Sequence, residues 1–273
     1  MRIGLVQTAP LFGAVKQNLA DACTAMASAE ANLWVLPELF TTGYQFASFD
    51  ELERLAESIP DGPTTQALIE FARLHDCAIA AGLAERDDEG RFFNAGILVD
   101  PRGVALRYRK IHLFAEEKQW FSPGDTPFET IELEGVRVGL LICFDHFFPE
   151  AARTLALRGA EVIAHPANLV MPVYAQITMR TRALENGVFT VTANRIGFEY
   201  RTSQPLTFTG CSQIVSPDGT LLYSGPADTV DVAVVDVDPA FARDKALNRW
   251  NDRFADRRPL LYDARLSGEQ DTD

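Results

Sequence analysis

The sequence predicts a layered α/β protein, because short apolar runs alternate with amphipathic stretches along the whole chain. The chain has 273 residues, 47% of them hydrophobic and 23% charged, which are the proportions of a globular protein with a sizeable core. No Gly/Ser-rich linker, composition break or short repeat divides it. Two sheets packed face to face under outer helices fit this pattern, and so does one doubly wound sheet, because periodicity does not choose between them.

The expected elements of the first half alternate between strand and helix. The strand-like apolar runs are Arg2–Gln7, Leu33–Leu36 and Ala78–Gly82. The stretches with helical periodicity are Lys16–Ala29 and Thr64–His75, the second with Pro63 at its start. A β-hairpin follows, because Asn94–Val99 and Val104–Arg109 flank an Asp-Pro-Arg-Gly turn.

The second half repeats this alternation. The expected strands are Val136–Ile142, Val162–Ala164, Val188–Ala193 and Val230–Val237. The expected helices are Pro149–Arg158 and Tyr174–Asn186, the latter closed by Gly187. A second hairpin joins Ser212–Val215 to Thr220–Leu222 through a Pro-Asp-Gly turn.

The charge and the cysteines narrow the range of partners and locations. A net charge of −13 repels phosphate groups, which argues against nucleic acid and anionic membranes as partners. The chain begins directly with a strand pattern, and no run approaches the ~18 apolar residues of a membrane span, so neither a signal peptide nor a spanning helix is expected. The four cysteines are far apart and lack CxxC spacing, which favours free thiols in a reducing cytoplasm.

Three polar residues stand where strands are expected to end. Glu38 follows a buried apolar run, Lys110 follows the first hairpin, and Cys143 ends a continuous apolar strand before a turn, where its thiol is expected to be exposed at the sheet edge. Taken singly, each has an ordinary alternative: a solvated carboxylate, a surface lysine and a buried structural cysteine. Together they supply the base, the cation and the nucleophile that acyl transfer through a covalent intermediate requires.

Other signals are weaker. No HExxH pattern, GxSxG elbow or glycine-rich phosphate loop is present, so no metal or cofactor is expected. His112 and His165 are interpreted as hydrogen-bonded structural histidines, whereas His146, three residues after Cys143, is a candidate for lining the pocket.

The same segments resemble a known family. Leu36-Pro37-Glu38, Tyr108–Leu113 and Ile142–Asp145, followed by Phe148-Pro149-Glu150, look like the three signature segments of the nitrilase superfamily, the carbon–nitrogen hydrolases. The resemblance covers nearly the whole chain and is closest to the compact archaeal and bacterial nitrilases and amidases, including the segment from Ala164 to Pro172.

The resemblance implies a four-layer α-β-β-α sandwich that forms homodimers or larger homo-oligomers. It makes Glu38 the general base, Lys110 the stabiliser of the tetrahedral intermediate and Cys143 the nucleophile. It also implies a second glutamate that positions the substrate. By position this is Glu117, with Glu116 a near competitor; the alternative is that both are surface charges on a helix.

The family also frames the expected domain and pocket. We expect one domain over residues 1–265, a tail from about 240 to 265 that crosses to a partner subunit, and a polar, flexible end at 266–273. The expected substrate-contacting residues are Tyr44, Phe144, His146, Phe147 and Asn168.

Three functions compete at this stage. The favoured one is hydrolysis of a small amide, because Phe144-Asp145 follows the cysteine where nitrile-cleaving members usually have Trp-Glu. Nitrile hydrolysis by the same site is the second, and a non-catalytic binding or scaffold protein that keeps the fold is the third. Phe147 and Phe148 predict an apolar wall, so a substrate carboxylate is not expected there unless Arg153 or Arg195 supplies a cation.

Overall fold

A computed structural model describes residues 1–262 of the chain, so the end expected to be flexible, 266–273, lies outside the described residues. Two six-stranded sheets form its centre. The first sheet has the order β14 (Asp231–Asp236), β1 (Arg2–Gln7), β2 (Leu33–Val35), β3 (Ala78–Arg86), β4 (Phe92–Asp100) and β5 (Gly103–Arg109). The second has the order β13 (Leu221–Ser224), β12 (Gln213–Val215), β9 (Phe189–Ala193), β8 (Val162–Pro166), β7 (Val136–Leu140) and β6 (Thr130–Leu133).

The two sheets are built alike. In the first, β1, β2 and β3 are parallel, and β14, β4 and β5 extend them in antiparallel pairing. In the second, β7, β8 and β9 are parallel, with antiparallel β6, β12 and β13 outside them. The parallel strands are buried on both faces, which explains why they read as continuous apolar runs in the sequence.

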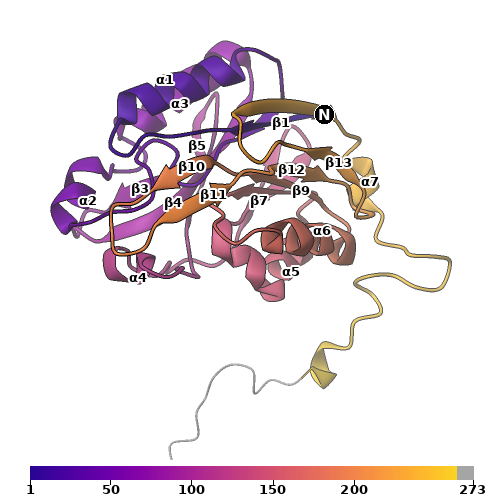
Figure 1. The fold of residues 1–273 in the computed structure, drawn as a ribbon. Coiled ribbons are helices and arrows are strands. Elements are labelled where there is room, and N and C mark those ends of the chain that lie inside the picture. Colours follow the sequence, from indigo (N-terminus) through magenta and orange to yellow (C-terminus); the bar gives the residue numbers. More distant parts are fainter. Residues whose placement is uncertain (263–273) are drawn as a thin grey trace, which may run out of the picture.

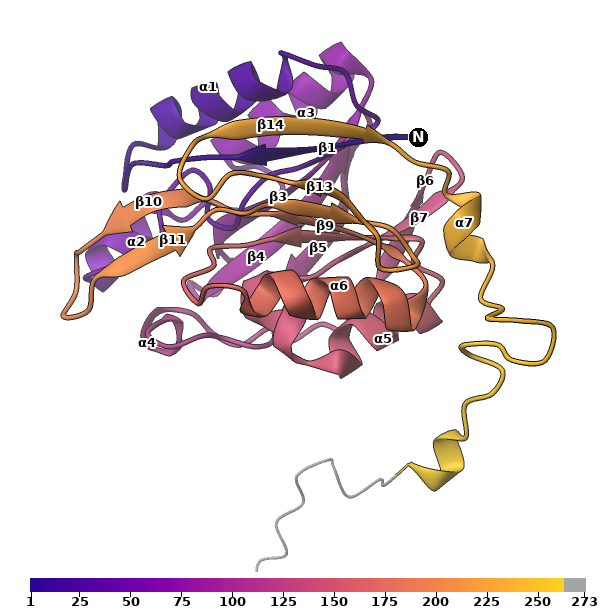
Figure 2. The ribbon, with the colours of Figure 1, turned by 45° about the vertical axis from the view of Figure 1, so that its right-hand side comes forward.

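Helices cover the outer faces of the sheets, as Figure 1 shows. The helices are α1 (Val15–Met26), α2 (Phe49–Leu55), α3 (Pro63–His75), α4 (Glu117–Trp120), α5 (Pro149–Leu157), α6 (Tyr174–Asn186) and α7 (Ala240–Arg243), with 3₁₀ turns η1 (Cys143–Phe147) and η2 (Pro259–Leu261). Helices α1 and α3 lie on one side of the body and α5 and α6 on the opposite side (Figures 1 and 2). A separate hairpin, β10 (Ile196–Glu199) and β11 (Leu206–Thr209), extends from the side.

The core has two principal parts. The central part lies between the sheets, where Leu5 and Val35 of the first sheet share one cluster with Val138 and Ile163 of the second. An outer part packs α1 and α3 against the first sheet. The expected α-β-β-α sandwich is therefore confirmed, and the alternative of a single doubly wound sheet is wrong.

Element boundaries differ slightly from the sequence expectations. Helix α6 spans the expected residues and ends at Gly187, which adopts a left-handed conformation with φ of +58°. Strand β7 ends at Leu140, two residues earlier than expected, because the chain turns into η1 there. Within residues 1–262, no helix is long and apolar enough to cross a membrane.

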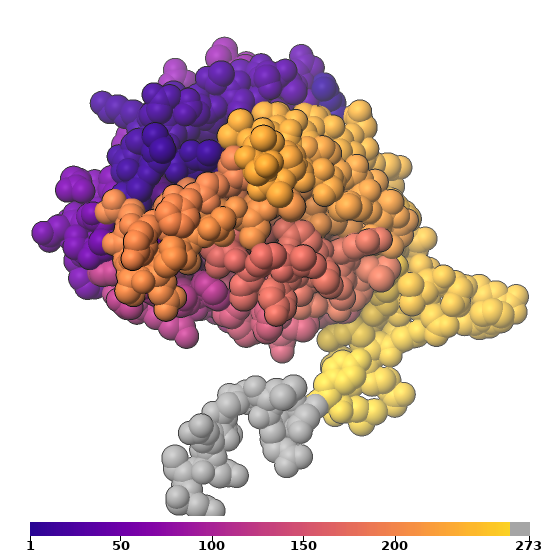
Figure 3. Space-filling model, in the orientation of Figure 1, coloured from indigo at the N-terminus to yellow at the C-terminus, as the bar shows by residue number. Residues whose placement is uncertain are grey.

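The chain leaves the body after α7 as an extended arm, residues 244–262 (Figures 1 and 3). Its base is attached to the C-terminal end of α6, where the Lys245 ammonium donates to the carbonyls of Asn186 and Gly187. Beyond that point Trp250, Leu260 and Leu261 are largely exposed.

Candidate active site

Glu38 stands just beyond β2 and is fully buried. Its Oε1 accepts hydrogen bonds from Asn94 Nδ2 and Lys110 Nζ, both at 2.7 Å. Its Oε2 is buried and has no hydrogen-bond partner within the described chain. The backbone of β3 approaches closely here, since a Cβ on Gly82 would lie 2.5 Å from Glu38 Cα. Glycine at 82 therefore lets the backbone of Glu38 lie against the sheet.

Lys110 follows β5 and is also fully buried. Its Nζ bonds Glu38 Oε1 at 2.7 Å and Glu117 Oε1 at 2.8 Å. Burial alone would lower the pKa of this ammonium, but the carboxylates of Glu117 and Glu38 raise it above its ordinary value. Burial raises the pKa of the Glu38 carboxyl, and the Lys110 cation opposes that rise. The lysine is thus held as a permanent cation beside Glu38.

The structure brings Glu117, not Glu116, to Lys110. Glu117 Oε1 also accepts from the Tyr44 hydroxyl at 2.6 Å, and Oε2 accepts from the Phe114 N–H. Glu116 points elsewhere and accepts from the Thr202 hydroxyl. Adjacent carboxylates diverge here because α4 begins between them.

Cys143 is the first residue of η1 and follows the end of β7 by three residues. Its backbone is left-handed, with φ of +42°, which is uncommon for a residue other than glycine. The side chain is 5% exposed, so the expectation of an exposed thiol at the sheet edge is wrong; the turn directs it into the core beneath Asn168, whose carbonyl lies 3.8 Å from Sγ.

Burial raises the pKa of the Cys143 thiol well above its ordinary value. The negative charge of Glu38 raises it further, and the Lys110 cation acts in the opposite direction. The resting residue is therefore a neutral thiol, and its reaction as a nucleophile requires a base to take the proton.

Asp145 fixes the turn that carries Cys143, a role that no sequence motif indicated. Its carboxylate accepts from the Ile142 N–H at 2.9 Å and from the Tyr108 hydroxyl at 2.7 Å, and bonds His112 Nδ1 at 2.7 Å. Tyr108 belongs to β5 of the first sheet and Asp145 to η1 after the second. This carboxylate therefore connects the turn that carries the thiol to the segment that carries Lys110.

Two buried histidines lie at the turn, His146 within η1 and His165 on β8. Burial lowers the pKa of His146 to about 4, and the nearby Arg182 cation makes a smaller contribution in the same direction. The Nδ1 atom of His146 lies 2.6 Å from Thr178 Oγ1. His165 is fully buried and contacts the Cys143 carbonyl. Both expected structural histidines, His112 and His165, are hydrogen-bonded.

A small cavity of about 20 Å³ opens beside Cys143. Its lining is mostly apolar and consists of Phe114, Phe144, His146, Asn168, Leu169, Val170, Met171 and Tyr174 together with Cys143. Both side-chain amide atoms of Asn168 are buried and lack a hydrogen-bond partner within residues 1–262. An unpaired amide in an apolar wall is suited to orient a polar group of a ligand.

The five residues expected to contact substrate differ in whether they line the cavity. Phe144, His146 and Asn168 line the cavity. Tyr44 lies to the side, bonded to Glu117. Phe147 is 49% exposed, and its ring stacks on Phe144 at 5.7 Å outside the cavity lining. Larger hollows of about 720 and 480 Å³ lie elsewhere, but neither contains Glu38, Lys110 or Cys143.

A buried carboxylate, a buried ammonium and a buried thiol thus lie near one another, since the charges of Glu38 and Lys110 both act on the pKa of Cys143. A sequence model of the carbon–nitrogen hydrolase family matches residues 2–246, and the chain belongs to that family, the nitrilase superfamily, whose members act on C–N bonds.

Three relatives illustrate the likeness. The chain is 49% identical over 232 residues to a protein named nitrilase from Pyrococcus abyssi, covering 85% of this chain and 86% of the other. It is 40% identical to an (R)-stereoselective amidase from Pseudomonas sp., covering 99% and 94%. Its structure resembles that of an amidase from Nesterenkonia sp. with a TM-score of 0.79 and 28% identity, covering 96% and 94%.

Proposed function

We propose that this chain hydrolyses a small amide to a carboxylic acid and ammonia through a thioester on Cys143. The observation that carries the proposal is the buried Glu38–Lys110–Glu117 unit, whose charges act on the neutral Cys143 thiol at the wall of an apolar cavity. Three buried ionisable groups held in contact would be costly to maintain unless they served chemistry.

The proposed first half-reaction forms the thioester. Glu38 Oε2, which has no other partner in the described chain, takes the Cys143 proton as Sγ attacks the amide carbon. The oxygen that becomes negative is stabilised by the Lys110 ammonium and the Phe144 N–H. The C–N bond then breaks, and the nitrogen leaves as ammonia with the proton that Glu38 carried.

The second half-reaction releases the acid. Glu38 takes a proton from water, and the resulting hydroxide attacks the thioester carbon. The C–S bond breaks, and the proton returns to Cys143, so that one water is consumed for each acid and ammonia formed. Glu117 accepts a hydrogen bond from Lys110 and thereby orients that cation.

The lining of the cavity supports a small, uncharged acyl group as substrate. Its walls are aromatic and aliphatic side chains with one unpaired amide, Asn168. Arg195 does not offer a cation there, because it is buried in an ion pair with Glu199. Solved complexes of the Nesterenkonia amidase contain acrylamide and butyramide, which are ligands of this kind.

A nitrile is the second candidate substrate, because the relative at 49% identity is named a nitrilase and the same trio would serve. The intact trio disfavours a non-catalytic scaffold. An ammonia-release screen over matched pairs, such as butyramide against butyronitrile, tests the proposal with Cys143→Ala as the blank. We expect amides to be preferred. Faster ammonia release from every nitrile would indicate that nitriles, not amides, are the substrates. If neither class released ammonia in a Cys143-dependent way, the proposal of a hydrolase would be contradicted.

We further propose that two copies associate and that the arm lies against the partner. Apolar side chains are exposed on α5 and α6, among them Leu157, Tyr174 and Ile177, and more lie along the arm. Light scattering should give twice the 30.2 kDa of one chain, and deleting residues 247–273 should weaken association. A stable monomer at micromolar concentration would contradict this.

The four free cysteines support the expected cytoplasmic location.

A further inference from the structure

The carbonyl oxygen of the peptide bond between Cys143 and Phe144 is held by a hydrogen bond. His165 Nε2 lies 2.9 Å from the Cys143 carbonyl oxygen. A carbonyl only accepts hydrogen bonds, so Nε2 must carry the proton and donate. Nδ1 then has the lone pair, and it accepts from the Thr192 hydroxyl at 3.0 Å. The imidazole is thereby held in one tautomer and one orientation.

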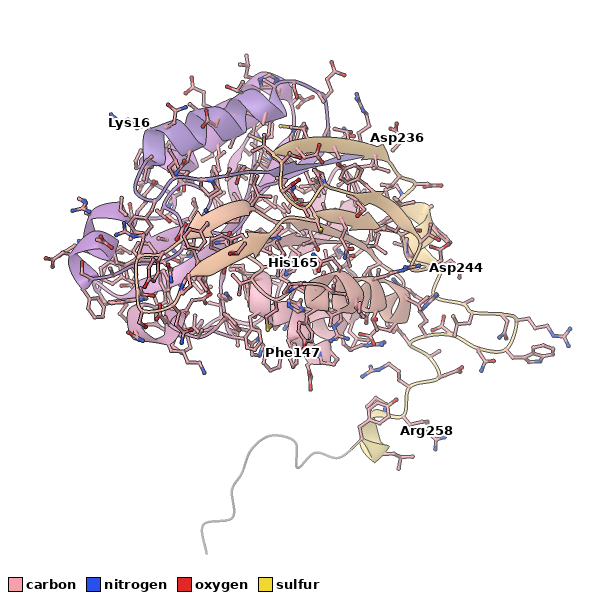
Figure 4. All side chains as sticks on the ribbon, viewed as in Figure 1. Lys16, Phe147, His165, Asp236, Asp244 and Arg258 are labelled. Atoms are coloured by element: carbon pink, nitrogen blue, oxygen red, sulfur yellow. The ribbon has the colours of Figure 1, made fainter. Side chains whose placement is uncertain are left out.

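This hydrogen-bonded arrangement is rigid because the His165 and Thr192 side chains come from paired strands. His165 on β8 stands in register with Thr192 on β9, and both are completely or almost completely buried. Burial, reinforced by the neighbouring His146, lowers the pKa of His165 to about 3. The ring is thus a neutral donor over the working pH range. Figure 4 shows His165 inside the body, beside the helices that cover the second sheet.

Fixing this carbonyl also fixes the N–H on the other side of the same peptide. The Cys143–Phe144 bond is trans, and in a planar trans peptide the C=O and N–H point in opposite directions. The Phe144 N–H donates to no acceptor outside its own 3₁₀ turn among residues 1–262. Cys143 and Phe144 line the cavity, whereas His165 is not part of its lining and lies next to His146. The carbonyl is therefore pulled inward and the N–H is turned toward the space beside Sγ.

We propose that His165 is a positioning residue that aims the Phe144 N–H at the developing oxyanion by holding the Cys143 carbonyl. The inference rests on the proposed function, since it concerns the acyl-transfer step at Cys143. It assigns His165 no contact with substrate and no proton transfer. Removing one oxyanion donor typically lowers kcat about 10²–10³-fold, and a misaimed donor should lower it by less.

A matched pair of variants isolates the contact. His165→Gln places an amide N–H at the reach of Nε2, so it can still hold the Cys143 carbonyl. His165→Asn reaches only as far as Nδ1, so it keeps a polar neighbour for Thr192 but releases the carbonyl. We expect kcat to fall about 10–100-fold in His165→Asn, with KM nearly unchanged, and to recover largely in His165→Gln.

Alkylation separates an oxyanion role from a general loss of structure. Iodoacetamide reacts with Cys143 by displacement at a saturated carbon, which forms no oxyanion. We therefore expect His165→Asn to be alkylated at Cys143 within about three-fold of the wild-type rate while its amide hydrolysis is impaired. Equal losses of alkylation and hydrolysis, or unchanged kcat in His165→Asn, would overturn the proposal.

Thr192→Val provides a second route if His165→Asn does not fold. It removes the hydroxyl that fixes the tautomer while keeping the shape of the side chain, and a smaller fall in kcat with normal alkylation is expected. An unchanged kcat there would also overturn the proposal. Failure of the proposed function is distinguishable, because wild-type protein would then release no ammonia that depends on Cys143.

Discussion

The two sheets are built alike but contribute to the site in different ways. The loops after the first sheet supply charged side chains that bind one another, namely Glu38, Lys110 and Glu117. The turn after the second sheet supplies one neutral thiol, and its partners hold backbone groups: Asp145 the Ile142 N–H and His165 the Cys143 carbonyl. The first sheet therefore provides the charged groups, and the second sheet fixes the position of the thiol and its neighbouring backbone groups. Variants on the two sides should fail in different ways.

The largest effect is expected on the charged side. Glu38→Gln keeps the shape and one hydrogen-bond acceptor but cannot take the Cys143 proton, so kcat/KM for amide hydrolysis should fall about 10³-fold or more. Steady-state ammonia release measures it. Glu116→Gln is the matched control, because Glu116 contacts Thr202 and not Lys110, and it should stay within about three-fold of wild type. If kcat/KM of Glu38→Gln were within ten-fold of wild type, Glu38 would not be the general base.

Lys110→Met should reveal how tightly the charges depend on one another. It leaves the Glu38 and Glu117 carboxylates buried without their cation, and breaking a buried ion pair in this way costs about 3–5 kcal/mol. Urea denaturation should show this loss, and the double variant Lys110→Met with Glu117→Gln should regain part of it. A loss below about 1 kcal/mol would mean that the network is not ionised as described.

Tyr44→Phe separates two roles for one hydroxyl. Tyr44 was expected from the sequence to contact substrate, whereas its hydroxyl bonds Glu117 in the structure. If it orients the charged unit, removing it should lower kcat about ten-fold, since a hydrogen bond to a charged group contributes about 1.5–3 kcal/mol, and KM should change little. A raised KM at constant kcat would instead indicate direct substrate binding.

Much of the fold could be predicted from the sequence, because alternating apolar runs are local signals. The choice between two sheets and one could not, since strand pairing depends on residues far apart in the chain. Helix α2 had a readable signal that the analysis missed: Ser48 caps the Glu51 N–H, a Ser-x-x-Glu pattern. Hairpin β10–β11 had a weaker signal, because its strands are only four residues each and it is held in place by a distant contact, the Gln45 N–H to Glu199.

The site was predictable in its residue types more than in its surroundings. Glu38, Lys110 and Cys143 each follow a strand-like run, so their meeting at one end of the sandwich could be expected. The roles of Asp145 and His165 could not, since each holds a backbone group whose position depends on the left-handed turn at Cys143. The same turn explains why the thiol is buried and not exposed.

The last effect is the pH dependence of stability that the buried His165 imposes. His165 has its pKa lowered to about 3 in the folded state, so between the ordinary histidine value and that pH the unfolded chain binds a proton that the folded chain does not. The free energy of unfolding should therefore fall as pH decreases through this window. His165→Gln should reduce that slope by up to about 1.4 kcal/mol per pH unit, measured by urea denaturation between pH 7 and pH 4. An identical slope in both proteins would mean that His165 is not held neutral.

The central claim is that Cys143 forms a covalent acyl intermediate with the help of charges from the opposite sheet. Acid-quenched turnover of a small amide, followed by peptide mass mapping, tests it most directly, with ammonia release by Cys143→Ala measured in parallel. The account predicts that the acyl group is found on the peptide containing Cys143 and that Cys143→Ala releases no ammonia above background. An acyl group on a different residue, or undiminished release by Cys143→Ala, would contradict it.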